Sequence, residues 1–239
     1  MPCADVLDNE PIASRGLTVF VVVDVSRSMR GNKIRTVNRV MRQIVPELRD
    51  IGGCNVRVDL AVMSFSDGCH WMHPSPVPVE SFSWADLEPG GWTSLGAACL
   101  ELDAKMSRNG FLGAPSLSFA PVVILLSDGA PTDRFEEAMY TLNRNRWFRH
   151  SIRVAFAIGA KAKVEKLSIF TGDPETVIKT NNMGSLSRLL RLITIRSSEI
   201  GSRSSSLSDD GCDGSKREDL IRAIRAAVDP SDLVLDEGW

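Results

Sequence analysis

The sequence predicts an α/β fold in which a doubly wound, mainly parallel sheet is flanked by helices. Two apolar runs, residues 17–23 and 122–126, are typical of parallel strands that are buried on both faces. Strand patterns alternate with helical patterns as far as residue 199, and this alternation specifies a parallel sheet with right-handed crossovers. A chain of 239 residues is also long enough to cover both faces of such a sheet.

The elements are predicted in a regular order after the first strand. Residues 33–51 place apolar side chains at three- and four-residue steps and predict an amphipathic helix. Residues 56–65 alternate as a strand does, residues 69–73 predict a surface loop, and the proline-broken segment 73–82 fits either an edge strand or a loop. The remaining predicted elements are helix 95–106, loop 107–120, strand 122–126, helix 134–145, strand 152–158, helix 164–170, strand 176–179 and helix 186–199.

The composition changes at both ends of this pattern. Residues 1–16 are a polar N-terminal extension, and residues 17–199 are the predicted domain. Residues 200–216 are dominated by Ser, Gly and Asp, contain few large apolar groups, and predict a flexible linker. Residues 217–239 predict a short C-terminal helix and tail. Because such a short helix is marginal alone in water, it packs either on the domain or on a partner.

Oxygen-bearing side chains follow the two apolar runs and one glycine turn. Asp24, Ser26 and Ser28 come after the first run, Asp128 follows the second, and Thr93 follows a Pro-Gly-Gly turn. Ligands of parallel sheets bind beyond the carboxyl ends of the strands, and Mg²⁺ prefers oxygen ligands and retains several waters. Each group alone also fits a helix cap or a tight turn, but their conjunction favours a site for Mg²⁺ or Mn²⁺.

The order and spacing of these residues are similar to a known motif. Asp24-x-Ser26-x-Ser28, Thr93 and Asp128, the last followed by glycine, resemble the metal-ion-dependent adhesion site (MIDAS) of von Willebrand factor A (vWA) domains. The resemblance implies that Ser26 and Ser28 bind the metal directly. It also implies that Asp24 and Asp128 act directly or through water, and that Thr93 joins or leaves the coordination shell with conformational state.

Two longer segments narrow the resemblance. Residues 17–29 and 125–133 are similar to the bacterial tellurium-resistance-associated, TerY-type subgroup of vWA proteins. This resemblance implies a bacterial stress-response or phage-defence setting, in which the chain works with a protein kinase and a PP2C-type phosphatase.

Two residues near the predicted site are candidates for contact with a partner. vWA domains usually have glycine between the two serines, where this chain has Arg27. The positive charge of Arg27 either weakens the affinity for metal or points outward and holds an acidic partner. Trp92 directly precedes Thr93, and aromatic residues are enriched at binding hot spots, although packing into the core fits Trp92 equally well.

Charge and composition exclude several kinds of partner. The net charge of −2 and the pI near 6.0 give no electrostatic basis for binding nucleic acid or anionic lipid. No apolar stretch is long enough to span a membrane, and the N-terminus is unlike a secretory signal. The five cysteines are irregularly spaced, as expected for reduced thiols. These properties predict a cytoplasmic protein with a protein partner.

The predicted site leads to three functional hypotheses. A cation held by hydroxyls and few carboxylates keeps an open coordination position that an Asp or Glu of another protein can fill, so the main hypothesis is a non-enzymatic, metal-dependent interaction module. A second hypothesis is an adaptor for an AAA-type ATPase, as several intracellular vWA proteins are. The third, Mg²⁺-dependent phosphate hydrolysis at Asp24, is disfavoured because Ser26 stands where such enzymes typically place an acidic proton donor.

Overall fold

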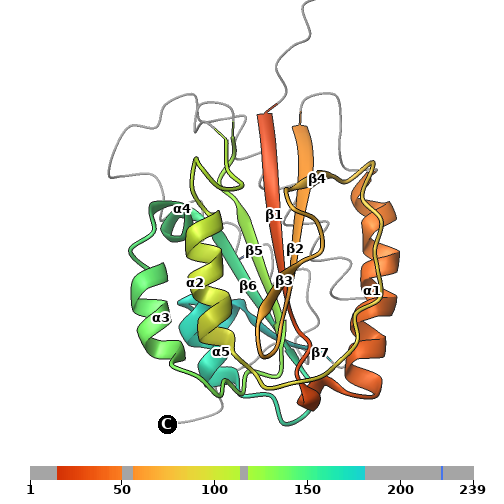
Figure 1. Ribbon diagram of the computed structural model, residues 1–239, viewed down its shortest axis with the longest axis vertical. Helices are drawn as coiled ribbons and strands as arrows, with labels where there is room; N and C mark the ends of the chain where they lie inside the picture. Colours follow the sequence, from red (N-terminus) through yellow and green to blue (C-terminus); the bar gives the residue numbers. More distant parts are fainter. Residues whose placement is uncertain (1–14, 50–55, 114–117, 181–221, 223–239) are drawn as a thin grey trace, which may run out of the picture.

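The computed structural model, which describes residues 15–49, 56–113, 118–180 and 222, contains a seven-stranded sheet with helices on both faces (Figure 1). The strands are β1 (Arg15–Asp24), β2 (Val56–Phe65), β3 (Cys69–Trp71), β4 (Val77–Pro78), β5 (Val122–Ser127), β6 (Ile152–Ile158) and β7 (Val177–Thr180). The helices are α1 (Asn32–Arg49), α2 (Leu95–Lys105), α3 (Phe135–Leu142), α4 (Arg146–His150) and α5 (Val164–Thr171), with the short 3-10 helices η1 (Arg27–Met29) and η3 (Pro174–Thr176). This architecture confirms the predicted doubly wound, mainly parallel α/β fold.

The sheet has the strand order β3-β2-β1-β5-β6-β7, and β4 also pairs with β2. The principal strands run parallel to one another, while β3 and β4 are antiparallel to β2 and cover its outer edge. The chain leaves β1 toward β2 on one side and later returns to β5 on the other, so the order reverses between β1 and β5. Ligands of such sheets bind at this switch point, beyond the carboxyl ends of the strands.

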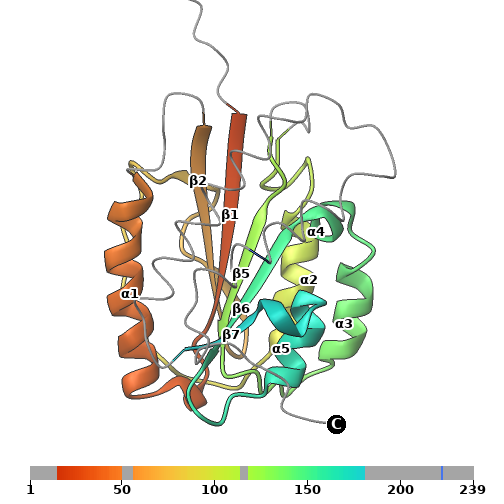
Figure 2. The ribbon, with the colours of Figure 1, turned by 180° about the vertical axis from the view of Figure 1, so that it is seen from behind.

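The two faces of β1 bury different sets of side chains. Val19, Val21 and Val23 belong to the core cluster that contains the inner face of α1, whereas Phe20 and Val22 belong to a second cluster with α2, α3 and α5. Figures 1 and 2 show the same division, with α1 on one face of the sheet and α2, α3 and α5 on the other. The continuous apolar run of β1 is therefore explained by burial on both faces.

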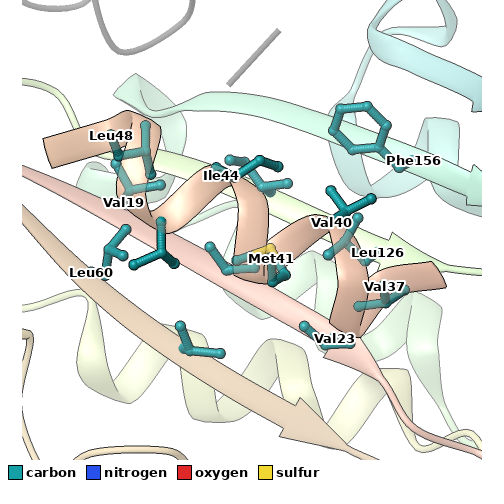
Figure 3. Packing of buried hydrophobic residues seen from close by; sticks show 14 of the residues in the cluster. Val19, Val23, Val37, Val40, Met41, Ile44, Leu48, Leu60, Leu126 and Phe156 are labelled. Atoms are coloured by element: carbon teal, nitrogen blue, oxygen red, sulfur yellow. The ribbon is translucent and has the colours of Figure 1, made fainter. Parts of the chain in front are cut away.

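The position of α1 follows from its apolar stripe. Figure 3 shows side chains of α1, among them Val40 and Ile44, packed with Val19 of β1 and Leu126 of β5. Full burial of one such side chain contributes about 1.5–3 kcal/mol to folding. This face of the helix holds α1 against the sheet, so that the first turn of α1 lies next to the loops that follow the parallel strands.

Two predicted elements differ from the structure. The predicted helix 134–145 corresponds to α3, which ends earlier, at Leu142. The short helix α4 is not among the predicted elements; it begins after Asn145, whose side chain accepts hydrogen bonds from the N–H groups of Trp147 and Phe148. The prediction of a surface loop at residues 69–73 is wrong, since part of this segment forms β3 along the edge of β2. The proline-broken segment contains the short edge strand β4, one of its two predicted alternatives.

The predictions for both ends of the chain lie largely outside the described residues. They concern the N-terminal extension 1–16, helix 186–199, linker 200–216 and the C-terminal helix and tail 217–239. Within the part of the chain that the structure describes, no helix combines the length and the apolar character needed to cross a membrane.

Candidate metal centre

The five predicted metal ligands lie on three loops at the carboxyl ends of the parallel strands. Asp24 ends β1 and is followed by Ser26 and by Ser28 in η1, Asp128 directly follows β5, and Thr93 precedes α2. In Figure 1 this edge of the sheet is at the lower end of the view, where β1 passes into η1. Ser28 is exposed, but the other four are buried, and buried polar side chains need partners because their desolvation is costly.

The loop after β1 places its two serine hydroxyls next to each other. Ser26 occupies the N-cap position of η1, but its side chain makes no capping hydrogen bond. Instead, Ser26 Oγ lies 2.9 Å from Ser28 Oγ. Neighbouring ligands of an octahedral Mg²⁺ also lie about 2.9 Å apart, because its metal–oxygen bonds are close to 2.0–2.1 Å. The two hydroxyls therefore have the spacing of adjacent metal ligands.

Asp24 is completely buried at the end of β1. Its Oδ1 accepts a hydrogen bond of 2.8 Å from the Ser26 N–H, and its Oδ2 accepts one of 2.6 Å from the Ser127 hydroxyl. Burial raises the pKa of the Asp24 carboxyl; the hydrogen bonds from Ser127 and Ser26 lower it, and the nearby Asp128 carboxylate raises it further. A nearby cation would stabilise the ionised form of this carboxyl.

Ser127, the last residue of β5, is a part of the site that the sequence patterns did not reveal. Its buried hydroxyl donates to Asp24 Oδ2 and accepts a hydrogen bond of 2.9 Å from the Gly129 N–H. Gly129 has a φ of 68°, and a Cβ atom there would lie 2.6 Å from the carbonyl oxygen of Lys163. The turn after Asp128 therefore requires glycine, and Ser127 joins this turn to the end of β1.

The two carboxylate oxygens of Asp128 have different surroundings. Oδ2 forms a salt bridge of 3.0 Å with Lys33 Nζ. Oδ1 is buried and has no hydrogen-bond partner in the described part of the protein. A buried charged oxygen without a partner carries a desolvation penalty, and a cation at the switch point would supply the missing interaction. Lys33 is a second neighbour of the site that the sequence patterns did not identify.

Hydrogen bonds attach the Thr93 loop to the loops after β1 and β2. The Arg27 N–H donates to the carbonyl oxygen of Gly91 at 3.1 Å. The Trp92 N–H donates to Oδ1 of Asp67, just beyond β2, at 2.7 Å. These contacts hold the segment before Thr93 beside the loop that carries Ser26 and Ser28.

On its other side, the Thr93 loop is attached to the loop after β5. The N–H and the hydroxyl of Thr132 both donate to the Thr93 carbonyl oxygen, at 2.9 and 3.2 Å, and Thr132 Oγ1 accepts a bond of 3.2 Å from the Thr93 N–H. The Asp133 carboxylate accepts bonds of 2.9 Å from the N–H groups of Gly96 and Ala97 at the start of α2. The three loops that carry the predicted ligands thus form one hydrogen-bonded unit.

Arg27 and Trp92 are both exposed beside these loops. Trp92 is 65% exposed, which excludes the core packing that the sequence left open for it. By contrast, Trp84 is partly buried against the core cluster on the α1 face of the sheet. Arg and Trp are the residue types most enriched at interface hot spots.

The set of available oxygens determines which metal fits. In the described residues, no group of three or more His, Cys, Asp and Glu side chains gathers to hold a metal. A cation at the switch point would depend on the carboxylates of Asp24 and Asp128, on hydroxyl groups and on water. An oxygen-only set with few carboxylates suits Mg²⁺ or Mn²⁺ and differs from the sulfur and nitrogen ligands of structural zinc sites.

The chain is similar to known proteins in its three-dimensional structure. No protein-family model and no curated protein matches this sequence. Proximal thread matrix protein 1 from the mussel byssus, solved with a zinc-occupied MIDAS motif, is 18% identical with a TM-score of 0.54, over 77% of this chain and 46% of that chain. A von Willebrand factor type A protein from Catenulispora acidiphila is 16% identical with a TM-score of 0.56, over 77% of this chain and 43% of that chain.

A pilus adhesin extends this similarity to a third protein. SpaC from Lactobacillus rhamnosus GG is 11% identical with a TM-score of 0.58, over 76% of this chain and 30% of that chain. The present chain matches less than half the length of each of these three proteins. With its strand order and its helices on both faces, the chain has the α/β fold of von Willebrand factor A domains.

Proposed function

We propose that this chain is a non-enzymatic interaction module in which a MIDAS-type site holds Mg²⁺ or Mn²⁺ and, through it, an Asp or Glu of a partner protein. The ligands would be Asp24, Ser26, Ser28, Thr93 and Asp128. The observation that carries the proposal is Oδ1 of Asp128, which is buried at the switch point without a hydrogen-bond partner in the described residues. The zinc-occupied MIDAS motif of the mussel protein, which has a similar fold, supports it.

Each residue has a separate task in the proposed mechanism. Ser26 and Ser28 present two adjacent oxygens, while the buried Asp24 carboxylate is held in place by the Ser26 N–H and the Ser127 hydroxyl. When bound, the cation supplies an open coordination position that a carboxylate can fill. The two carboxylates of the set neutralise the charge of a dication but do not exceed it, so the site has no net negative charge that would repel an acidic partner.

Arg27 and Trp92 form the proposed contact surface around the open position. Arg27 can donate charge-assisted hydrogen bonds to an acidic partner segment, and Trp92 offers a large apolar area that a partner can cover. Both side chains are exposed, and a hydrogen bond from the Arg27 N–H to Gly91 places them on adjoining loops.

A metal titration tests the site directly. Calorimetric titration of Mg²⁺ and Mn²⁺ into the metal-stripped protein is expected to give saturable binding that is lost in the double variant Ser26→Ala with Ser28→Ala. The matched control is Ser107→Ala with Thr141→Ala, because these two exposed hydroxyls donate to the carbonyl groups of Ala104 and Glu137 and contact none of the loops that carry the proposed ligands. Absence of binding by the wild type at millimolar metal, or equal binding by both double variants, would contradict the proposed site.

The identity of the partner is a more specific proposal than the metal site and needs a separate test. The TerY-type resemblance supports a cytoplasmic bacterial setting with a protein kinase and a PP2C-type phosphatase as partners. Affinity capture in the presence of Mg²⁺, compared with capture after metal chelation, is expected to recover a kinase or phosphatase only with metal. Recovery of an AAA-type ATPase instead would favour the adaptor hypothesis, and metal-dependent hydrolysis of a phosphate ester that Asp24→Asn abolishes would contradict the non-enzymatic role.

A further inference from the structure

The salt bridge between Lys33 and Asp128 links the first turn of α1 to the loop after β5. Lys33 Nζ lies 3.0 Å from Asp128 Oδ2, although the two residues are 95 positions apart in the sequence. The Asp128 side chain is 7% exposed and that of Lys33 is 29% exposed. This ion pair is therefore shielded from water more than a surface pair is, and a charge at this position acts on the site with little screening.

The fold confines the Lys33 side chain to this position. Gly159, directly after β6, has a φ of 93°, and a Cβ atom at Gly159 would lie 2.7 Å from Lys33 Cε. The lysine chain thus passes close over a residue that has no side chain. The start of α1 and the turns after β5 and β6 therefore meet around the Lys33 side chain, with its ammonium group against Asp128.

The two carboxylate oxygens of Asp128 have different roles at the proposed site. Lys33 occupies Oδ2, while Oδ1 is left buried without a partner in the described residues. The ammonium group compensates one of the two carboxylate charges of Asp24 and Asp128 before any metal is present. A divalent cation then arrives at a site that already contains a positive charge, and the repulsion between the two weakens metal binding.

We propose that Lys33 is a positioning residue that holds Asp128 in place in the metal-free protein and lowers the affinity of the site for divalent cations. This inference rests on the proposed function, because it assigns Lys33 a role toward the same metal site. Its consequence is a site that is folded before metal arrives and that releases metal readily unless a partner carboxylate completes the coordination shell.

Metal affinity provides the first test. Titration of Mn²⁺ into Lys33→Gln is expected to give binding about tenfold tighter than in the wild type, because one nearby positive charge is removed. Lys33→Arg keeps the charge, and Arg30→Gln removes an exposed cation three residues away, so both are expected to stay within about twofold of the wild type. Lys33→Met gives the same comparison if the glutamine variant does not fold.

A second test needs no metal. The free energy of unfolding of the metal-stripped protein is measured by urea denaturation. Introducing Lys33→Gln into the wild type is expected to lower it more than introducing Lys33→Gln into the Asp128→Asn variant, because the asparagine has no buried charge for Lys33 to compensate. Equal destabilisation in both backgrounds would show that the pair is not coupled and would overturn the positioning role.

The outcomes separate the two proposals. If the wild type binds Mn²⁺ and Lys33→Gln binds it equally or more weakly, the role of Lys33 is wrong and the metal site stands. If neither protein binds Mn²⁺, the proposed function is wrong and the role of Lys33 falls with it. Binding by Lys33→Gln that is about tenfold tighter than binding by the wild type supports Lys33 as the residue that limits metal affinity.

Discussion

The hydroxyl of Ser127 donates a hydrogen bond of 2.6 Å to Oδ2 of Asp24 and so joins the last residue of β5 to the last residue of β1. Both side chains are completely buried, and the contact crosses the switch point of the sheet. Because Ser127 also accepts the N–H of Gly129, one hydroxyl orients both loops that carry the carboxylates of the proposed site.

Replacement of Ser127 by alanine should destabilise the protein. The variant removes the donor to Asp24 and leaves the Gly129 N–H without its acceptor, and hydrogen bonds to charged groups contribute about 1.5–3 kcal/mol. We therefore expect the free energy of unfolding of the metal-free protein to fall by about 2 kcal/mol, measured by urea denaturation. Ser107→Ala, which removes a hydroxyl bound to Ala104 at the surface, should change it by less than about 0.5 kcal/mol; an equal effect in both variants would refute the role of Ser127.

Replacement of Thr132 by valine should loosen the Thr93 loop without altering its packing volume. The variant removes the hydroxyl that donates to the Thr93 carbonyl and accepts the Thr93 N–H. A loss of about 1 kcal/mol of local stability would increase amide hydrogen exchange of Thr93 about fivefold. Thr141→Val is the control, because that threonine donates to Glu137 within α3 and does not touch the loop. Unchanged exchange at Thr93 in the Thr132 variant would mean that the backbone bond from the Thr132 N–H is sufficient.

The stability of the metal-free protein should depend on pH through Asp24. Because burial raises the pKa of this carboxyl, the native state takes up its proton at a higher pH than the unfolded state does. The contribution of Asp24 to the free energy of unfolding is therefore largest below the ordinary Asp pKa, about 3.9, and is lost as the pH rises through the raised pKa of the folded state.

Comparison with Asp24→Asn isolates this contribution from other carboxyls. The free energy of unfolding of both proteins is measured by urea denaturation across the acid range. The value for the wild type, relative to that of the variant, should increase as the pH falls. Saturating Mg²⁺ should make this difference depend less steeply on pH, because metal binding favours the deprotonated carboxyl. Parallel pH profiles for the two proteins would show that burial does not disfavour the charged form of Asp24.

Local sequence patterns predicted most of the principal strands and several helices. Burial on both faces of a strand requires a continuous apolar run, as in β1 and β5, and burial of one face of a helix requires apolar residues at three- and four-residue steps, as in α1. Both patterns can be recognised from the order of residues alone. The early end of α3 and the separate helix α4 were missed, because a cap formed by the single side chain of Asn145 leaves no periodic pattern in the sequence. The strand at Cys69–Trp71 was missed because three residues are too few to show a period, and their pairing with β2 decides their conformation.

The oxygen-rich loops were visible in the sequence, but the groups that support them were not. Asp24, Ser26 and Ser28 stand close together in the chain, and this proximity made a metal site a testable hypothesis. Ser127 and Lys33 have no such pattern, since their contacts with Asp24 and Asp128 span 103 and 95 residues.

The order of the residues by itself determined the alternation of strands and helices, the burial of β1 and β5 and the position of polar side chains just beyond them. Only the tertiary structure decided that Asp24 meets Ser127, that Lys33 reaches one oxygen of Asp128 and that the other oxygen remains without a partner in the described residues. The physical reason is range. Periodicity and turn preferences act between near neighbours in the chain, whereas hydrogen bonds and ion pairs at a switch point form between strands that only the completed sheet brings together.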